Sequence, residues 1–268
     1  MAATLVARVV PPAFLGGGGT RLVERNFMVF KRGWLVFVSG FFEPLFYLLS
    51  VGIGISKLAG PITLANGSVL SYTAFIAPAM MASSAMNGAV YDATFNIFFK
   101  LKYAKLYDAV LATPMTTRDV AVGEITWALL RGMFYATSFL LVMLIMGLVH
   151  SWWAVLAVPA ALLIGWAFAS VCMAATTYMR SWQDFEFVTL TTMPMFLFSA
   201  TFYPLETYPG ALQVIVQCTP LYQGVALVRG LTTGAVGGGM VINVAYLAAM
   251  GLVGVAISSR RLEKLLLR

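Results

Sequence analysis

The sequence predicts an all-α integral membrane protein with six transmembrane helices. Of its 268 residues, 60% are hydrophobic and only 10% are charged, whereas soluble domains usually carry about 25% charged residues. Helices that face hydrocarbon need apolar side chains on every side, so this composition suits a bilayer. The basic residues flank the apolar stretches, as orientation signals do, and form no stripe interleaved with aromatic residues. A lipid bilayer is therefore the expected surrounding, and nucleic acid is not an expected partner.

The chain begins with a segment that we expect to be a flexible tail, residues 1–19. It is too weakly apolar and too rich in Pro and Gly for a signal peptide. Residues 20–268 then form one transmembrane domain. Its first element, Thr20–Arg32, is a predicted amphipathic helix lying along the inner membrane face, although an ordinary charged stop before a span is the plainer alternative. Charged side chains share one face of it: Arg21, Glu24, Arg25 and Arg32. Apolar side chains share the other: Leu22, Val23, Phe27 and Phe30.

The spans follow from the lengths of the apolar stretches, since a helical crossing needs about 20 mostly apolar residues. Residues 132–179 contain no Asp, Glu, Lys or Arg, which is too long for one crossing and fits two. The break falls at His150-Ser151-Trp152-Trp153, where the indoles suit a membrane interface. The six predicted spans are 33–56, 69–91, 120–149, 153–178, 185–203 and 240–259.

A further uncharged stretch, residues 207–228, is interrupted by prolines and glutamines. It suits a short helical hairpin at the outer face better than a lipid-facing span. The basic residues support this choice. With six spans and both termini in the cytoplasm, only Lys57, Arg131 and Arg229 of the 17 Lys and Arg residues fall outside the cytoplasmic segments. A seventh span would place the C-terminal basic residues outside, against the positive-inside rule.

The cytoplasmic connection from Lys100 to Asp119 contains a short helical pattern closed by Pro114. A short amphipathic helix exposed to the cytoplasm suits docking into a groove of another protein, and a packed surface turn is equally compatible with the sequence. The apolar positions of this short helical pattern are Leu106, Tyr107, Val110 and Leu111. Thr116, with Asp119 three residues on, predicts the N-cap of the next helix.

A few ionisable residues fall within or beside the predicted spans. Glu43 and Arg131 each lie about ten residues into a span that starts from the cytoplasm, so they are expected at similar depth and could pair. Glu124, two turns before Arg131, is a second possible partner. Either a polar element of a translocation path or a buried ion pair that fixes helix packing fits this pattern. Asp92 is expected to be merely interfacial.

Motifs for catalysis are missing from the sequence. There is no GxxxxGK[ST] for nucleotide phosphates, and no HExxH, CxxC or GxSxG. We therefore expect no catalytic, cofactor-binding or metal site, and any ATP hydrolysis that drives the protein would come from a partner.

Several stretches together resemble one known family. They are FEPLFYL at 42–48, SYTAF at 71–75, KLYDAVLATPMTTRDVAVGE at 105–124 and MPMFLFSATFYPLETYP at 193–209. Their order is similar to that of the ABC-2 type permeases, in particular the branch with the nodulation lipo-oligosaccharide exporter of rhizobia and multidrug exporters. One departure is Ala200, where related permeases commonly carry glycine, and its expected effect is on how closely a neighbouring helix packs.

The resemblance implies a permease subunit of an ATP-driven exporter in a bacterial inner membrane. Two permeases, as a homodimer, would dock on two copies of a separate subunit that binds ATP and Mg²⁺. The segment Leu106–Leu111, including Asp108, would act as the coupling helix, with the Thr20–Arg32 helix beside it. The cargo would be amphipathic: a glycolipid, a lipid-linked saccharide or a hydrophobic drug. Aromatic residues could line its path, although they also suit lipid-facing or core positions: Phe196, Phe198, Phe202 and Tyr203.

Two other classes of protein remain as alternatives. A secondary transporter driven by an ion gradient usually shows internal repeats and several ionisable residues near the midplane. Here the two three-helix halves show no repeat, and only Glu43 and Arg131 qualify. A membrane-embedded enzyme acting on lipids would need a cluster of His, Asp and Glu, but His150 is the sole histidine.

Overall fold

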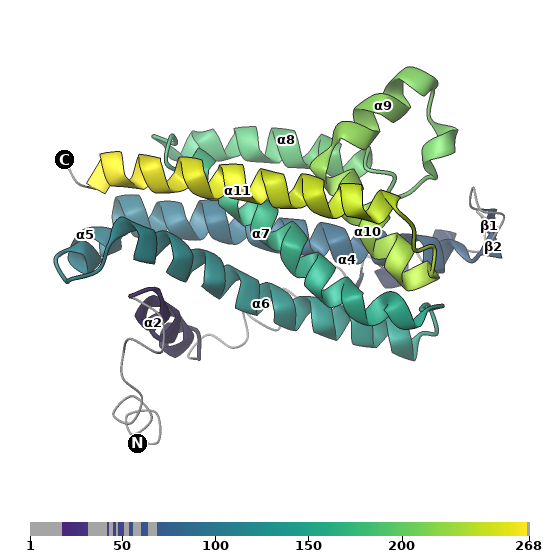
Figure 1. The fold of residues 1–268 in the computed structure, drawn as a ribbon, viewed down its shortest axis with the longest axis horizontal. Coiled ribbons are helices and arrows are strands. Elements are labelled where there is room, and N and C mark those ends of the chain that lie inside the picture. The colour runs from purple at the N-terminus through teal and green to yellow at the C-terminus, as the bar shows by residue number, and fades with distance from the viewer. Residues whose placement is uncertain are drawn as a thin grey trace.

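The computed structural model describes residues 18–31, 42, 45–46, 48–50, 54–55, 60–63 and 69–266, and this part is mostly helical (Figure 1). Most of the predicted span 33–56, with Glu43 inside it, and the tail before residue 18 lie outside the described residues. The helices, strands and short helical turns are α2 (Gly19–Lys31), β1 (Ile62–Thr63), β2 (Val69–Leu70), α4 (Tyr72–Tyr91), η1 (Asp92–Asn96), η2 (Phe99–Tyr103), α5 (Leu106–Leu111), α6 (Thr117–Ile145), η3 (Trp152–Leu156), α7 (Ala157–Thr176), η4 (Trp182–Asp184), α8 (Phe185–Leu197), η5 (Leu205–Thr207), α9 (Gly210–Cys218), α10 (Pro220–Thr233) and α11 (Gly239–Leu266).

Helix α7 is the centre of the bundle, and α4, α6, α10 and α11 pack around it. It carries no charged residue, and its alanines are largely buried. Small residues let neighbouring helices approach closely. Gly254 of α11 shows how closely: a Cβ there would lie 2.7 Å from the backbone carbon of Ser170. The α7–α11 crossing therefore depends on glycine at this position.

Three described helical segments are long and apolar enough to cross a membrane: Asp119–Ile145, Trp152–Thr176 and Gly239–Lys264. They match the predicted spans 120–149, 153–178 and 240–259. Helix α8 begins at the predicted residue but has 13 residues, about 20 Å of helix, which is shorter than a hydrocarbon core of about 30 Å. Helix α4, with 20 residues, is long enough to cross a membrane, but it is less apolar than these three segments. The structure thus supports three crossings, or four if a bent pair counts, and six stay a prediction.

That bent pair is α9 and α10, which meet at an angle of 87°. The break has a local cause, because Pro220 opens α10 and the Thr219 side chain caps it by accepting from the Tyr222 amide. Together α9 and α10 project at one end of the bundle (Figure 1). The stretch 207–228, predicted as a short helical hairpin at the outer face, thus contains α9 and the first part of α10, and its place at the outer face stays a prediction.

A two-stranded antiparallel ribbon corrects the all-α prediction. Strands β1 and β2 pair Ile62 with Leu70 and Thr63 with Val69. Val69 and Leu70 were expected to open the second span, but α4 starts at Tyr72, where the Ser71 side chain accepts from the Ala74 amide. The β-branched residues Ile62, Thr63 and Val69 suit an extended backbone, which explains the difference.

Helix α4 also continues beyond its predicted end at residue 91. Two π-helical turns, η1 and η2, extend it to Tyr103, because residues 92–103 contain no Gly or Pro to stop a helix. The chain then turns at Lys105, whose φ is 43°, and α5 follows. The connection predicted to begin at Lys100 is therefore partly helical.

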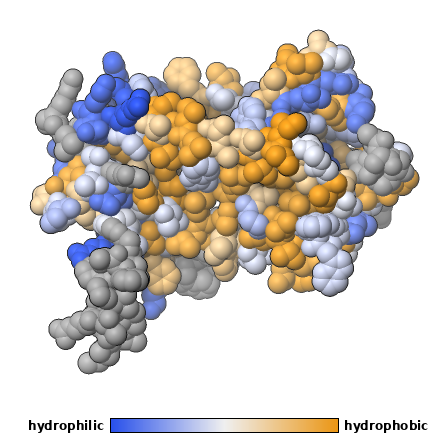
Figure 2. Space-filling view, viewed as in Figure 1, coloured by the Kyte–Doolittle hydropathy of each residue, from blue (hydrophilic) through white to orange (hydrophobic). Residues whose placement is uncertain are grey.

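The surface matches a membrane protein. Figure 2 shows an apolar band across the middle of the face, with hydrophilic residues gathered towards the two ends. Many large apolar side chains are exposed on the helices, including Leu141, Phe187 and Val241. Contiguous exposed apolar surface of this extent suits hydrocarbon rather than water.

Candidate functional site: two buried ion pairs

An ion pair joins α6 to the end of α4. Arg131 of α6 binds Asp92 of η1, and their side chains are 11% and 6% exposed. The ring of Phe30, from α2, lies 5.2 Å from the Arg131 guanidinium carbon. The expectation that Asp92 is merely interfacial is wrong. Within the described residues Arg131 does not pair with Glu124, and the possible pair with Glu43 lies outside the described residues.

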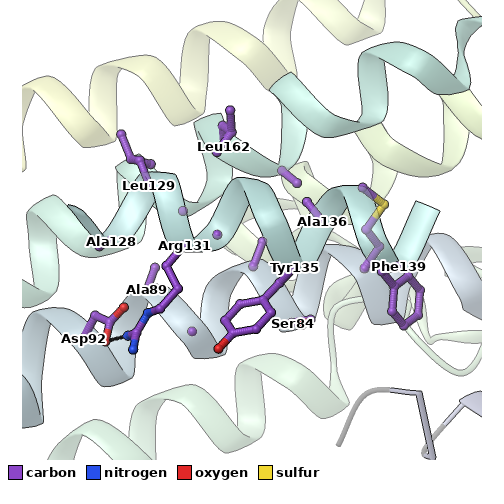
Figure 3. A pocket seen from close by; sticks show the side chains of 16 residues that line it. Ser84, Ala89, Asp92, Ala128, Leu129, Arg131, Tyr135, Ala136, Phe139 and Leu162 are labelled. Atoms are coloured by element: carbon purple, nitrogen blue, oxygen red, sulfur yellow. Dashed lines mark ion pairs between the residues drawn. The ribbon is translucent and has the colours of Figure 1, made fainter. Parts of the chain in front are cut away.

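Beside this pair is a small cavity between α4, α6 and α7 (Figure 3). Its volume is about 20 Å³, enough for one water molecule, which needs about 10–15 Å³. Small residues create the space, since a Cβ added at Gly88 or Gly132 would meet nothing within 4 Å. Ser84 and Tyr135 border the cavity and bring hydroxyl groups to it (Figure 3). The cavity is thus polar at one end and apolar over the rest of its lining.

A second ion pair lies nearer the start of α6. Lys100 Nζ is 2.7 Å from Glu124 Oε2 and 2.9 Å from Oε1, and the Glu124 side chain is 3% exposed. The Asn26 amide of α2 donates to Glu124 Oε2 at 3.2 Å, while Lys100 also donates to Asn26 Oδ1. Glu124, a second possible partner of Arg131 on the sequence alone, binds Lys100 instead. We call Asn26, Lys100 and Glu124 the joint cluster.

Tyr107 connects this cluster to α5. Its side chain is fully buried, and burial together with the nearby negative charge of Glu124 raises the pKa of Tyr107 well above its ordinary value of 10.0. The phenol thus stays neutral beside the carboxylate. Segments α2, η2, α5 and α6 all meet at this point.

Helix α5 has the predicted bounds. Its apolar positions, which the sequence suggested for docking, instead face the bundle. Leu106, Val110 and Leu111 are half-buried and pack on the core of the bundle. Asp108 and Ala109 point outward and are exposed. The predicted N-cap after this helix is confirmed, since Thr116 and Asp119 form a reciprocal capping box at the start of α6.

Helix α2 occupies Gly19–Lys31, close to the predicted amphipathic helix. Arg21 and Glu24 are exposed as expected, Arg25 is half-buried, and Phe27 is 62% exposed. The polar Asn26 is buried instead, which the two-face pattern did not predict. Gly19 lies against α6: a Cβ on Gly123 would come within 2.9 Å of the Gly19 carbonyl oxygen.

The four predicted path aromatics do not meet in one place. Phe196 and Phe202 pack edge to face at 5.4 Å, Phe198 lies near Tyr208, and Tyr203 is exposed. None of the four lines the cavity at Arg131. Their role in a substrate path stays a prediction.

Arg229 of α10 is a polar residue that the sequence analysis did not single out for a role. Its guanidinium lies 3.8 Å from the centre of the Phe75 ring and donates to the Phe75 carbonyl at 3.3 Å. It also donates to the Ala200 carbonyl at 2.8 Å. Ala200 has a φ of 52°, a left-handed conformation that glycine adopts more easily. Arg229 therefore ties the bent helix pair to α4 and to the end of α8.

The part of the chain that the structure describes shows no group of three or more His, Cys, Asp or Glu side chains that could hold a metal ion. What the described site offers is a set of buried ionic contacts at helix junctions.

Comparison with known proteins agrees with this picture of a helical membrane protein. Residues 20–233 match the family described as ABC-2 type transporter, and the chain belongs to that family. It is similar to nodulation protein J of Rhizobium leguminosarum bv. viciae, with 30% identity over 91% of this chain and 93% of the relative. Nodulation protein J of Sinorhizobium fredii is 29% identical over 91% and 92% of the two chains. The protein of the same name from Rhizobium meliloti is 30% identical over 79% and 80%.

The family defines the class of the chain: a membrane permease domain that carries no ATPase domain itself. Permeases of this family work with separate ABC ATP-binding subunits.

Proposed function

We propose that the chain is the transmembrane permease subunit of an ATP-driven exporter in a bacterial inner membrane. It moves an amphipathic substrate, such as a glycolipid, a lipid-linked saccharide or a hydrophobic drug, out of the cytoplasm or the inner leaflet. Two permeases form a homodimer and dock on two copies of the ATP-binding subunit, which hold the ATP and Mg²⁺. Six spans place both termini in the cytoplasm and the bent pair α9–α10 outside.

The joint cluster is the observation that carries this proposal. Lys100 and Glu124 fasten the segment leading into α5 to the start of α6, and Asn26 adds α2 to the same point. A buried, hydrogen-bonded ion pair of this kind holds its partners in one geometry. A force applied to α5 by a docked subunit therefore reaches α6, the helix that also carries Arg131.

The free face of α5 is where we propose that the subunit docks. Asp108 and Ala109 are exposed at the end of the molecule where the C-terminal part of α11 lies (Figure 1). That end holds the basic residues Arg260 and Lys264, as the positive-inside rule requires of a cytoplasmic face. The half-buried Leu106 and Leu111 instead anchor α5 to the bundle.

The test is co-purification with the ABC ATP-binding protein encoded beside this chain, together with ATPase activity. The variant Asp108→Arg with Ala109→Arg changes only the exposed face of α5. We expect it to lose the complex and the permease-dependent ATPase activity while eluting as a folded protein.

The matched control is Glu186→Arg, an exposed charge reversal in the first turn of α8 at the same end of the molecule. It should retain the complex. If the α5 double variant retains it as well, docking on α5 is wrong. A wild-type chain that associates with no ATP-binding protein would overturn the exporter itself.

A further inference from the structure

Residues 199–208 join α8 to α9 (Figure 1), and we call this segment the strap. Side chains from two other helices hold it. Arg229 of α10 donates to the Ala200 carbonyl at 2.8 Å, and Tyr72 of α4 donates to the Phe202 carbonyl at 3.4 Å. The position of the strap therefore depends on hydrogen bonds that α4 and α10 provide.

The backbone of the strap contributes little to holding it. Residues 199–203 form no backbone–backbone hydrogen bond within the described part of the chain. Ala200 has a φ of 52° and is 1% exposed, and this conformation is unfavourable for an L-residue. A scarcity of backbone hydrogen bonds is typical of segments that open locally, without unfolding of the whole molecule. Local opening would also release the strain at Ala200.

Buried hydroxyl groups of the strap lack partners as well. Thr201 is fully buried, and its Oγ1 has no hydrogen-bond partner among the described residues. The same holds for the buried Oη of Tyr208, at the other end of the strap. A buried polar group without a partner is unfavourable, because it has lost its water and gained nothing in exchange. Both the backbone and the side chains of the strap thus favour another conformation.

The contact with Arg229 is of a kind that can be made and broken. Its guanidinium binds two backbone carbonyls, those of Phe75 and Ala200, and lies over the Phe75 ring. It takes part in neither of the ion pairs found among the described residues. Because Arg229 is only half-buried, water can replace a carbonyl that moves away, and no opposite charge is left unpaired.

We propose that the strap opens locally at the outer end of the bundle and that Arg229 is the latch that holds it closed. The outer position and the purpose rest on the proposed function, in which this opening lets the cargo leave beside α4 and α10. The observed conformation is the closed one. Opening relieves the backbone of Ala200 and gives the Thr201 hydroxyl access to water.

The test measures opening through the reaction of a buried cysteine. Ser199→Cys, in a background with Cys172→Ala and Cys218→Ser, places a thiol at a fully buried position of the strap. N-ethylmaleimide reaches it only when the strap opens, and mass spectrometry of the purified full-length chain in detergent gives the rate. Thr232→Cys, at a position of α10 that is 1% exposed, is the matched control. We expect Ser199→Cys to react at least about tenfold faster than this control.

Further substitutions in the Ser199→Cys background test the cause. Thr201→Val keeps the shape and removes the hydroxyl without a partner, so it should favour the closed state and slow the reaction about tenfold. Thr207→Val, at an exposed position of the same strap, should leave the rate unchanged. Arg229→Gln removes the latch and should speed the reaction about tenfold. Tyr72→Phe removes only the second hydrogen bond to the strap and should speed the reaction less.

Equal rates for Ser199→Cys and Thr232→Cys would overturn the proposal, because the strap would then open only with the whole molecule. An unchanged or faster reaction in Thr201→Val would overturn it too, since the buried hydroxyl would then favour the closed state or have no effect.

Failure of the proposed export function is distinguishable, because the labelling needs no ATP-binding subunit. A chain whose strap opens but that associates with no such subunit keeps the local opening and loses the export role. Where the complex forms, ATP with vanadate should change the labelling rate of Ser199→Cys. Equal rates with and without these additions would overturn the role of the strap in release of the cargo.

Discussion

Ala200 is the residue whose backbone most needs an explanation. It lies just after α8 in a left-handed conformation with φ of 52°, is 1% exposed, and offers its carbonyl to Arg229. The sequence comparison with related permeases suggested that alanine in place of glycine changes helix packing. The structure gives a different reason for glycine there, because an L-residue in this conformation is strained.

We expect Ala200→Val to lower the melting temperature in detergent. A β-branched residue fits the left-handed conformation poorly, and the buried position leaves no room for two more methyl groups. A loss of about 2–3 kcal/mol corresponds to a shift of several degrees. Ala200→Gly should change Tm much less, because relief of strain offsets the lost methyl group. Equal Tm values for all three proteins would contradict the assigned strain.

The Asp92–Arg131 pair predicts a coupled effect. Asp92→Asn leaves a buried guanidinium without its counter-charge, which typically costs about 3–5 kcal/mol. The double variant Asp92→Asn with Arg131→Gln removes both charges and should be more stable than Asp92→Asn alone. Thermal unfolding in detergent measures both, with the exposed Asp108→Asn as control. Strictly additive losses would argue that the two side chains do not interact.

Tyr107 predicts a dependence on alkaline pH. Its folded-state pKa lies above 10.0, so the folded state favours the neutral phenol. This contribution to stability is present below about pH 10 and is lost as the pH rises through the unfolded and then the folded pKa. Tyr107→Phe should therefore lose less stability than wild type between about pH 9 and pH 11. The exposed Tyr103→Phe is the control, and Tm against pH is the measurement.

At the scale of elements, the sequence predicted helices better than contacts. The bounds of α5, those of α7 to within a few residues and the start of α11 follow from apolar length, caps and breakers, which are local signals, whereas α11 continues seven residues past its predicted end at 259. The partners of Arg131 and Glu124 could not be predicted, because they depend on the π-helical turns of η1 and η2. Those turns set which way Asp92 and Lys100 face, and a stretch such as 92–103 gives no local sign of them.

The packing of α2 on α6 depends on glycine. A Cβ on Gly123 would lie 2.9 Å from both the Gly19 carbonyl oxygen and the Leu22 Cβ, so Gly123→Ala should push α2 away and strain the joint cluster. Gly132→Ala, nine residues further along the same helix, faces open space and should be neutral or stabilising by up to about 1 kcal/mol. Protease sensitivity at Arg21 and Arg25 reports the release of α2. Equal sensitivity in the two variants would show that the close contact is unimportant.

At the scale of the whole molecule, apolar surface lies between two polar ends (Figure 2). The basic residues Arg260 and Lys264 belong to the C-terminal turns of α11, which lie at the same end as α5, while the bent pair α9–α10 projects near the other end (Figure 1). Positive charge marks the cytoplasmic side. The orientation thus follows from the distribution of charge. The number of crossings depends on the helices, of which three, or four with the bent pair, are long and apolar enough.

This orientation predicts the sidedness of two engineered cysteines in a background with Cys172→Ala and Cys218→Ser. Glu206→Cys, beside α9, should react with a membrane-impermeant maleimide in intact cells. Asp108→Cys, on α5, should react only after the membrane is opened. The reverse pattern would invert the orientation, and reaction of both in intact cells would rule out a topology that places them on opposite sides.

The two π-helical turns between α4 and α5 have a consequence for how relatives of this chain can differ. A π turn holds one residue more than the α-helical turn it replaces, and each residue advances a helix by about 100°. Deleting one residue from 92–96 would swing Lys100 away from Glu124 without altering either flanking sequence. A single-residue gap in an alignment of this segment therefore indicates that the helix is rotated at this point and that the joint cluster is altered. Counting substitutions alone would miss this change.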